Sequence, residues 1–251
     1  MEEGYFESDL RKRRIALYRN LTRFFAAPLR RRYLEVDASG LENLQKSRSS
    51  VLAMHHELGI DGWIVASLLQ ERDKQKVHYL TQKEGIFTSC WGSLMLELEE
   101  IHLSIDKTKK RDIAKAIIEA GDYLNNTQDH VGVFNDGPFA TIINLNREAL
   151  PLKDRLNYPI AATIAKKYDK PLIPIAEWCA EQHRKALCFW WMAGGIRTIW
   201  RNLLYMERNK PMEYKIAFLL PLNPNDFSKV IDLADEVRKK QIELYDQIIE
   251  D

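Results

Sequence analysis

The chain is poor in cysteine, in long apolar runs and in net charge. Its three cysteines, Cys90, Cys179 and Cys188, are odd in number, lack CxxC spacing and stand in apolar or aromatic surroundings. They indicate buried reduced thiols in a reducing compartment more than a disulfide framework or a metal cage. No apolar run reaches the roughly 18 residues of a transmembrane segment, so we expect none.

The charges nearly cancel, with 37 basic and 36 acidic residues. Net charge therefore gives no reason to expect a nucleic-acid partner, and we expect none. Residues 1–10 carry three glutamates and an aspartate, unlike a secretory signal with its positive start and apolar centre. We therefore expect no such signal.

Short apolar runs alternate with longer amphipathic segments, which is the pattern of an α/β domain with a mixed, largely parallel sheet flanked by helices. With 251 residues, 45% of them hydrophobic, the chain can bury one sizeable core. A single catalytic domain over residues 33–251 is the simplest division. Strands are expected at residues 50–54, 76–79, 101–105, 130–134, 171–175 and 214–220, and helices at 60–71, 108–120, 156–168 and 226–250.

A basic amphipathic helix is predicted ahead of this domain, within residues 1–32. Ser8 or Asp9 can cap its start, and we expect Pro28 to end or kink it before the arginines at 30–32. Such a helix can lie in an anionic bilayer interface, and we favour that interpretation over a helix packed on the domain with solvated arginines. Its apolar face holds Ile15, Tyr18, Leu21, Phe24, Phe25 and Leu29, and the cations between them are Arg11, Lys12, Arg13, Arg14, Arg19 and Arg23.

His56 and Asp61 are the candidate catalytic pair. The predicted strand 50–54 runs straight into His55-His56, and Asp61 follows across a tight turn at Gly59. A carboxylate at this spacing can reach one imidazole nitrogen and leave the other free to take a proton, and imidazole ordinarily titrates near neutral pH. On this segment alone, ordinary surface or core histidines would be the better explanation.

Further segments strengthen the catalytic interpretation. Residues 103–107 read Leu-Ser-Ile-Asp-Lys, 134–140 read Phe-Asn-Asp-Gly-Pro-Phe-Ala, 150–153 read Leu-Pro-Leu-Lys and 171–175 read Pro-Leu-Ile-Pro-Ile. In this order, with the histidine and aspartate before them, they resemble the motifs of the PlsC-like glycerolipid acyltransferases, the lysophosphatidic acid (1-acylglycerol-3-phosphate) acyltransferase family. A lead-in at 38–44 is also similar, and the resemblance spans roughly residues 33 to 250.

The resemblance implies transfer of a fatty acyl group from acyl-CoA or acyl carrier protein, a thioester co-substrate, with no cofactor. His56 is then the general base on the acceptor hydroxyl, oriented by Asp61, without a covalent enzyme intermediate. Backbone N–H groups at Asn135, Asp136 and Gly137 can bind an anionic or oxyanionic centre, although an ordinary polar turn is the alternative. Asp136 stands where the family has a glutamate.

Two positions depart from the family pattern. The arginines expected to hold the acceptor phosphate correspond here to Lys107 and Phe139. Lys107 supplies a point charge, but Phe139 cannot bind phosphate. A phosphate-bearing acceptor then needs another cation, such as Arg147, Lys153 or Arg155. An acceptor without a phosphomonoester, such as an amino-acid-linked lipid, a glycolipid or a polyketide-like alcohol, is a serious competitor.

The most apolar and aromatic part of the chain is residues 186–196, followed by Trp200. There Phe189, Trp190 and Trp191 can line an acyl-chain tunnel or dip into the headgroup region, and plain core is an equal alternative. The remaining histidines are scattered and lack HExxH spacing, so we expect no metal.

We therefore expect a peripheral enzyme at the cytoplasmic face of a membrane, which acylates a hydroxyl or amine of a lipid-like acceptor. The competing function is a catalytically silent lipid-binding relative of the same fold. The altered third motif favours it, and the retention of both His56 and Asp61 opposes it. A thioester hydrolase lacks a serine or cysteine nucleophile at a recognisable elbow.

Overall fold

A seven-stranded sheet forms the centre of the molecule, in a computed structural model that describes residues 27–44, 48–58, 61–82, 102–105, 110–136, 150–187 and 196–250. The strand order is β1-β7-β6-β2-β5-β3-β4, and every neighbouring pair is parallel except β6 and β7. The strands are β1 (Leu34–Ser39), β2 (Val51–Met54), β3 (Val77–Gln82), β4 (His102–Ile105), β5 (His130–Phe134), β6 (Leu172–Cys179) and β7 (Met212–Phe218). The mixed, largely parallel sheet expected from the sequence is confirmed.

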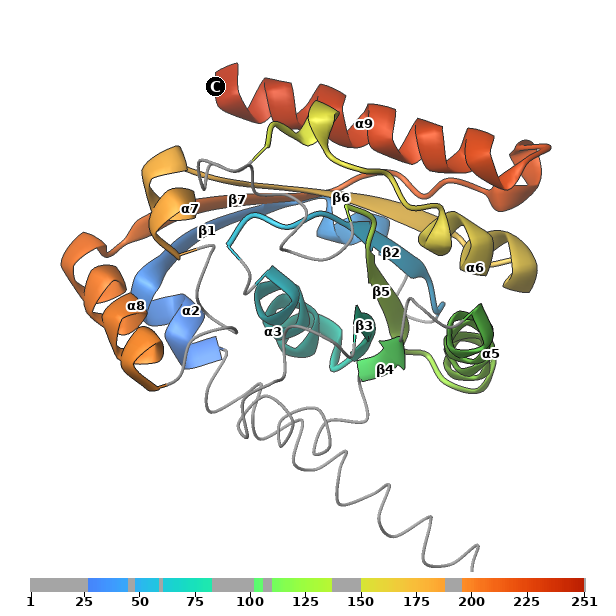
Figure 1. The fold of residues 1–251 in the computed structure, drawn as a ribbon, viewed down its shortest axis with the longest axis horizontal. Helices are drawn as coiled ribbons and strands as arrows, with labels where there is room; N and C mark the ends of the chain where they lie inside the picture. The colour runs from blue at the N-terminus through green and yellow to red at the C-terminus, as the bar shows by residue number, and fades with distance from the viewer. Residues whose placement is uncertain are drawn as a thin grey trace, which may run out of the picture.

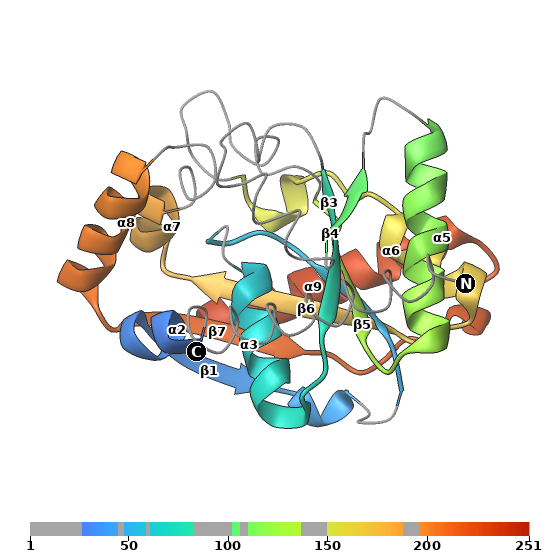
Figure 2. The same ribbon diagram turned by 90° about the horizontal axis from the view of Figure 1, so that it is seen from below.

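Helices cover both faces of this sheet. Figure 1 shows α9 running across one face and α3 packed against the other, and Figure 2 gives the view from the α3 side. Side chains of α5, α6 and α9 share one buried cluster with the sheet. The helices described are α2 (Ala27–Tyr33), α3 (Asp61–Asp73), α5 (Lys110–Asn126), α6 (Ile160–Tyr168), α7 (Glu181–Leu187), α8 (Ile196–Asn209) and α9 (Val230–Glu250). Among them, none has both the length and the apolar character to span a bilayer.

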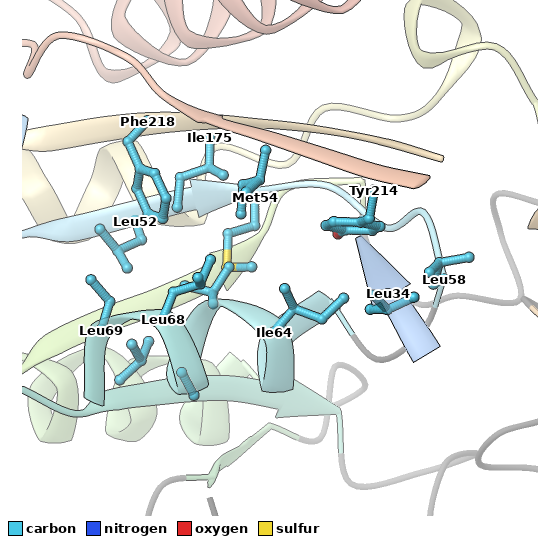
Figure 3. Close-up of a cluster of buried hydrophobic side chains, with 14 of the residues drawn as sticks. Leu34, Leu52, Met54, Leu58, Ile64, Leu68, Leu69, Ile175, Tyr214 and Phe218 are labelled. Carbon is cyan, nitrogen blue, oxygen red and sulfur yellow. The ribbon is translucent and has the colours of Figure 1, made fainter. Parts of the chain in front are cut away.

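Alternate side chains of β2 build two separate cores. Leu52 and Met54 face α3, whereas Val51 and Ala53 join the cluster beneath α5, α6 and α9. Successive side chains of a strand point to opposite faces, so a strand covered on both sides reads as an unbroken apolar run. Fully burying a leucine or methionine side chain contributes about 1.5–3 kcal/mol. Figure 3 shows the core on the α3 side, with Leu52, Met54, Ile175 and Phe218 above Ile64, Leu68 and Leu69.

α3 is held inside this core on nearly all sides. Residues 64–69 are buried in succession, as expected for a helix with apolar residues around its whole circumference. Packing therefore fixes the helix, and with it Asp61, the residue at which the helix begins. A predicted catalytic side chain is thus attached to one of the best-packed elements of the molecule.

The sequence did not predict β1, α7 or α8. β1 is an edge strand in which Glu35 and Asp37 are exposed between partly buried residues, so its apolar signal is weak. It pairs with β7 and so joins the amino-terminal part of the domain to its carboxyl-terminal part. β6 also extends four residues beyond its predicted end, to Cys179.

We expected Pro28 to end or kink a helix before the arginines at 30–32, and the structure places the arginines themselves in a helix. α2 includes all three arginines, and Pro28 lies in its first turn, where a missing N–H group is tolerated. The arginines form ion pairs of 2.6–3.0 Å with Glu71 of α3 and Glu207 of α8. This end of the predicted amino-terminal helix is therefore packed on the domain. Residues 1–26 lie outside the described residues, and their membrane association stays a prediction.

Candidate active site

The carboxyl edge of the sheet brings the predicted pair and the predicted turn together. β2 and β5 are parallel neighbours with Met54 opposite Phe134, so the residues that follow them emerge at the same edge. The backbone N–H of His56 donates to Oδ2 of Asp136 at 2.8 Å, and the N–H of Asn135 donates to the carbonyl of Met54 at 2.9 Å. In open α/β sheets this is the edge at which ligands bind.

Asp61 faces the imidazole of His56. Nδ1 of His56 lies 3.8 Å from Oδ2 of Asp61. Asp61 is 1% exposed, whereas the side chain of His56 keeps 13% of its surface accessible. Asp61 also accepts the backbone N–H groups of Glu57 and Leu58 at 3.1 and 2.8 Å, so the turn after β2 closes around its carboxylate. The side chain of His56 is therefore accessible from solvent, whereas that of Asp61 is not.

Asp61 is ionised in the interior. Burial alone would raise the pKa of this carboxyl, but contact with His56 and the N–H groups of Leu58 and Glu57 outweigh burial, and the pKa lies below its ordinary value. An anion facing Nδ1 favours the tautomer that carries its proton there. The other ring nitrogen, Nε2, is then the one suited to accept a proton.

Phe134, the last residue of β5, supports the face of the imidazole. The two rings stack with 3.9 Å between centroids and 6° between planes. Aromatic pairs of this kind contribute about 0.5–1.5 kcal/mol beyond the area they bury. With Asp61 at its edge and Phe134 on its face, the ring of His56 has a defined orientation.

Arg155 is a buried cation that joins three parts of the site. Its guanidinium donates to the carbonyl of His56 at 2.6 Å, to Oδ2 of Asp136 at 3.2 Å and to Oε1 of Glu57 at 3.2 Å. Its Nε donates to the carbonyl of Leu150 at 2.8 Å. The planar fork of arginine suits such a junction. Arg155 was a candidate ligand for an acceptor phosphate, but its donors are engaged within the protein.

His55 belongs to the core and not to the reacting pair. It is fully buried, and its Nε2 accepts the backbone N–H of Glu177 at 3.0 Å. Its Nδ1 therefore carries the proton of the neutral ring and faces Oε1 of Glu57 at 3.5 Å. Glu57 also accepts Arg184 of α7 at 3.2 Å. Of the two adjacent histidines, only His56 remains accessible.

Glu177 of β6 is a buried carboxyl group whose pKa is raised. Burial is the largest cause, and the negative charges of Asp61 and Glu57 add to it, so the pKa of Glu177 lies well above its usual range. The residue is fully buried. The charged cluster of the site therefore includes one carboxyl group that keeps its proton to higher pH than an ordinary glutamate does.

The structure describes part of the predicted site. His56, Asp61, Asn135 and Asp136 lie together. Lys153 is exposed on a short 3-10 turn, Leu152–Asp154, and its substrate-binding role stays a prediction. The predicted residues Lys107, Gly137, Phe189, Trp190 and Trp191 lie outside the described residues.

Sequence reasoning missed four members of the site: the buried Glu57, Glu177 and Tyr214 and the partly buried Arg184. Glu177 had a signal, because an acidic residue that directly follows the apolar run 171–176 needs an explanation. Arg184 had none, because α7 was not expected and its contact with Glu57 spans 127 positions. Tyr214 reads as an ordinary strand residue.

The fold and the site define an α/β protein with a histidine–aspartate pair at the carboxyl edge of its parallel strands. A family model described as Acyltransferase matches residues 35–178, and the chain belongs to this family. The predicted resemblance and the predicted enzyme class, an acyltransferase, are confirmed.

One solved structure and the curated proteins complete the comparison. The crystal structure of the 1-acyl-sn-glycerophosphate (LPA) acyltransferase PlsC from Thermotoga maritima is similar in fold, with a TM-score of 0.54 and 16% identity. The match covers 93% of this chain and 79% of that one. At this identity the likeness concerns the fold. No curated protein matches.

Proposed function

We propose that the protein transfers a fatty acyl group from acyl-CoA or acyl carrier protein to a hydroxyl or amine of a lipid-like acceptor. The observation that carries this proposal is the oriented His56–Asp61 pair at the carboxyl edge of the sheet, in a member of the Acyltransferase family. The thioester is already activated, so no cofactor and no metal are required.

His56 acts as general base in this proposal. Its Nε2 removes the proton of the acceptor hydroxyl while the oxygen attacks the thioester carbonyl. The tetrahedral intermediate then expels the thiolate, which takes the proton back from His56, and an ester and a free thiol leave. Asp61 stabilises the imidazolium that exists between the two proton transfers.

The turn after β5 is assigned to the charge that develops on the carbonyl oxygen. The N–H of Asn135 is bonded to the carbonyl of Met54, so the backbone N–H groups of residues 136 and 137 are the ones proposed for an anionic centre. The side chain of Asp136 already bonds His56 and Arg155, so its share in substrate binding falls to its backbone. Lys107 and Lys153 remain the proposed contacts of a charged acceptor group.

We further propose that the enzyme works peripherally at an anionic, cytoplasmic membrane surface. Trp200 and Leu204 lie one turn apart on α8 and are 62% and 53% exposed. Arg201 and Arg208 of the same helix are also exposed. Aromatic and leucine side chains beside arginines suit the boundary between headgroups and acyl chains. Sedimentation with vesicles should show binding to phosphatidylglycerol that Trp200→Ala and Leu204→Ala together weaken. Equal binding by the double variant contradicts the role of this face.

The test of the function is an acyl-transfer assay with acyl-CoA or acyl carrier protein and a panel of acceptors, including lysophosphatidic acid and phosphate-free lipids. Product formed by the wild type and by His78→Ala, but not by His56→Ala, supports the proposal. Indistinguishable yields from wild type and His56→Ala contradict the role of His56. Vesicle binding without transfer to any acceptor favours the silent lipid-binding alternative.

A further inference from the structure

The hydroxyl of Tyr214 bonds the aspartate of the pair from a distant strand. Tyr214 lies on β7, and its hydroxyl donates to Oδ1 of Asp61 at 2.9 Å. Its side chain is fully buried, and Figure 3 places its ring near Leu34, Met54 and Leu58. β6 separates β7 from β2 in the sheet, so this contact joins the carboxyl-terminal strand to the catalytic turn.

The donors around Asp61 divide between its two oxygens. Oδ1 accepts the N–H of Leu58 and the hydroxyl of Tyr214, and Oδ2 accepts the N–H of Glu57 and faces Nδ1 of His56. The two backbone donors belong to the same turn as His56 and move with it. Tyr214 instead fixes the carboxylate to the sheet.

Tyr214 is a dependable donor. Burial and the negative charge of Asp61 hold the pKa of Tyr214 well above its ordinary value. The phenol therefore keeps its proton over the whole pH range in which an imidazole changes charge. The carboxylate of Asp61 can only accept in this contact.

We propose that Tyr214 is a positioning residue of the acyl transfer, whose hydroxyl holds Oδ1 of Asp61 so that Oδ2 stays on Nδ1 of His56 through both proton transfers. The inference rests on the proposed roles of His56 and Asp61. Without the hydroxyl, the carboxylate keeps only the two backbone donors of the turn, and more of its negative charge acts on the imidazole.

Tyr214→Phe removes one oxygen and keeps the ring. Tyr79→Phe is its matched control, because Tyr79 is also buried and its hydroxyl donates to the carbonyl of Gly62, the residue after Asp61, at 2.6 Å. Each variant loses a hydrogen bond to the start of α3. Only one of them loses a bond to Asp61.

Tyr214→Phe is expected to lower kcat about 10-fold with both KM values unchanged. The ascending limb of its kcat–pH profile should move to higher pH, because an aspartate with one donor fewer stabilises the imidazolium more. Tyr79→Phe should lower Tm to a similar extent and leave kcat and the profile unchanged. Should Tyr214→Phe fail to fold, 3-fluorotyrosine at position 214, a stronger donor, should move the limb to lower pH.

Wild-type kcat and profile in Tyr214→Phe, or the same loss and shift in Tyr79→Phe, overturn the inference. No shift with the fluorinated residue does so as well. His56→Ala in the same assay separates the two proposals. Full activity of His56→Ala means that the base is misassigned. An inactive His56→Ala together with an unaffected Tyr214→Phe contradicts the role of Tyr214 alone.

Discussion

Two histidine–aspartate pairs within the described residues look alike locally and lie at opposite edges of the same sheet. His56 follows β2 and faces Asp61 at 3.8 Å, whereas His78 is the second residue of β3 and contacts Asp129 at 3.1 Å. β2, β3 and β5 are parallel, so the first pair lies at their carboxyl edge, and the second, with Asp129 just before β5, at their amino edge.

The two pairs share more than their residue types. Each imidazole stacks on an aromatic ring, His56 on Phe134 at 3.9 Å and His78 on Tyr123 at 3.8 Å. In both aspartates burial would raise the pKa, and the histidine contact together with backbone donors lowers it below its ordinary value. The shorter distance belongs to the pair at the amino edge. Distance, stacking and charge therefore do not distinguish a reacting pair from a structural one.

The surroundings do distinguish them. Asp61 is wholly buried, whereas the side chain of Asp129 is 17% exposed. His56 and Glu57 in the turn after β2 are also bonded to Asp136 and Arg155, and these bonds connect β2, β5 and the segment before α6. The edge of the sheet and this charged framework make the first pair a candidate active site.

Exchanging each aspartate for asparagine gives the largest expected contrast. Asp61→Asn should lower kcat about 10³-fold, because a neutral amide cannot stabilise the imidazolium. Asp129→Asn should change kcat less than about 3-fold, since ordinary structural substitutions away from a site act on stability. Release of free thiol from acyl-CoA, followed with a thiol reagent, measures both. Similar losses in the two variants would break the distinction between the two edges.

Removing the buried cation of Arg155 tests whether its ion pairs with Glu57 and Asp136 hold the turn of His56. Arg155→Met keeps much of the side-chain volume but leaves Glu57 and Asp136 buried without their cation, and should cost about 3–5 kcal/mol of unfolding free energy. Arg32→Met, which breaks a largely exposed and solvent-screened pair with Glu207, should cost far less. Urea unfolding compares them. Equal costs would mean that the framework does not hold the turn.

The sequence predicts those features that depend on residues close together in the chain. His56 and Asp61 were found because a strand end and a helix start five residues apart leave a local pattern. The core strands were found because residues such as Val51 and Leu52, buried on opposite faces, form apolar runs. These features depend on neighbouring residues only.

The rest of the site depends on contacts between distant segments. Arg155 reaches the carbonyl of His56 across 99 positions, and Tyr214 reaches Asp61 across 153. No sequence neighbour of Arg155 indicates that its guanidinium forms buried ion pairs within the protein. Edge strand β1 was missed for a related reason, because its pairing with β7 is evident only in the folded sheet.

Replacing the buried Glu177 by glutamine removes a titratable group and should change the pH dependence of stability. The folded pKa of Glu177 is raised, so the stability that its protonated form contributes is fully present below the unfolded pKa of about 4.3 and is lost as pH rises toward the folded value. Between the unfolded and the folded pKa the advantage of Glu177→Gln over wild type should therefore grow by about 1.4 kcal/mol per pH unit.

Asp129→Asn should change the pH dependence of stability in the opposite direction. The folded pKa of Asp129 is lowered, so its contribution is present above its unfolded pKa and disappears as pH falls through the folded value. The variant should be less stable than wild type at pH 7 and approach it in acid. Urea unfolding from pH 2 to 8 measures both variants. Parallel curves for wild type and Glu177→Gln would show that the pKa of Glu177 is not raised in the folded protein.

Removing the aromatic ring stacked on each histidine should have the smallest effect on kcat. Phe134→Leu removes an aromatic face from His56 and should lower kcat about 2- to 10-fold, the rate equivalent of about 0.5–1.5 kcal/mol. Tyr123→Leu removes the same kind of contact from His78 and should leave kcat unchanged while it lowers Tm. Stacking then matters for the reaction only where the ring must accept a proton. A loss of kcat in Tyr123→Leu without one in Phe134→Leu would reverse the assignment of the two edges.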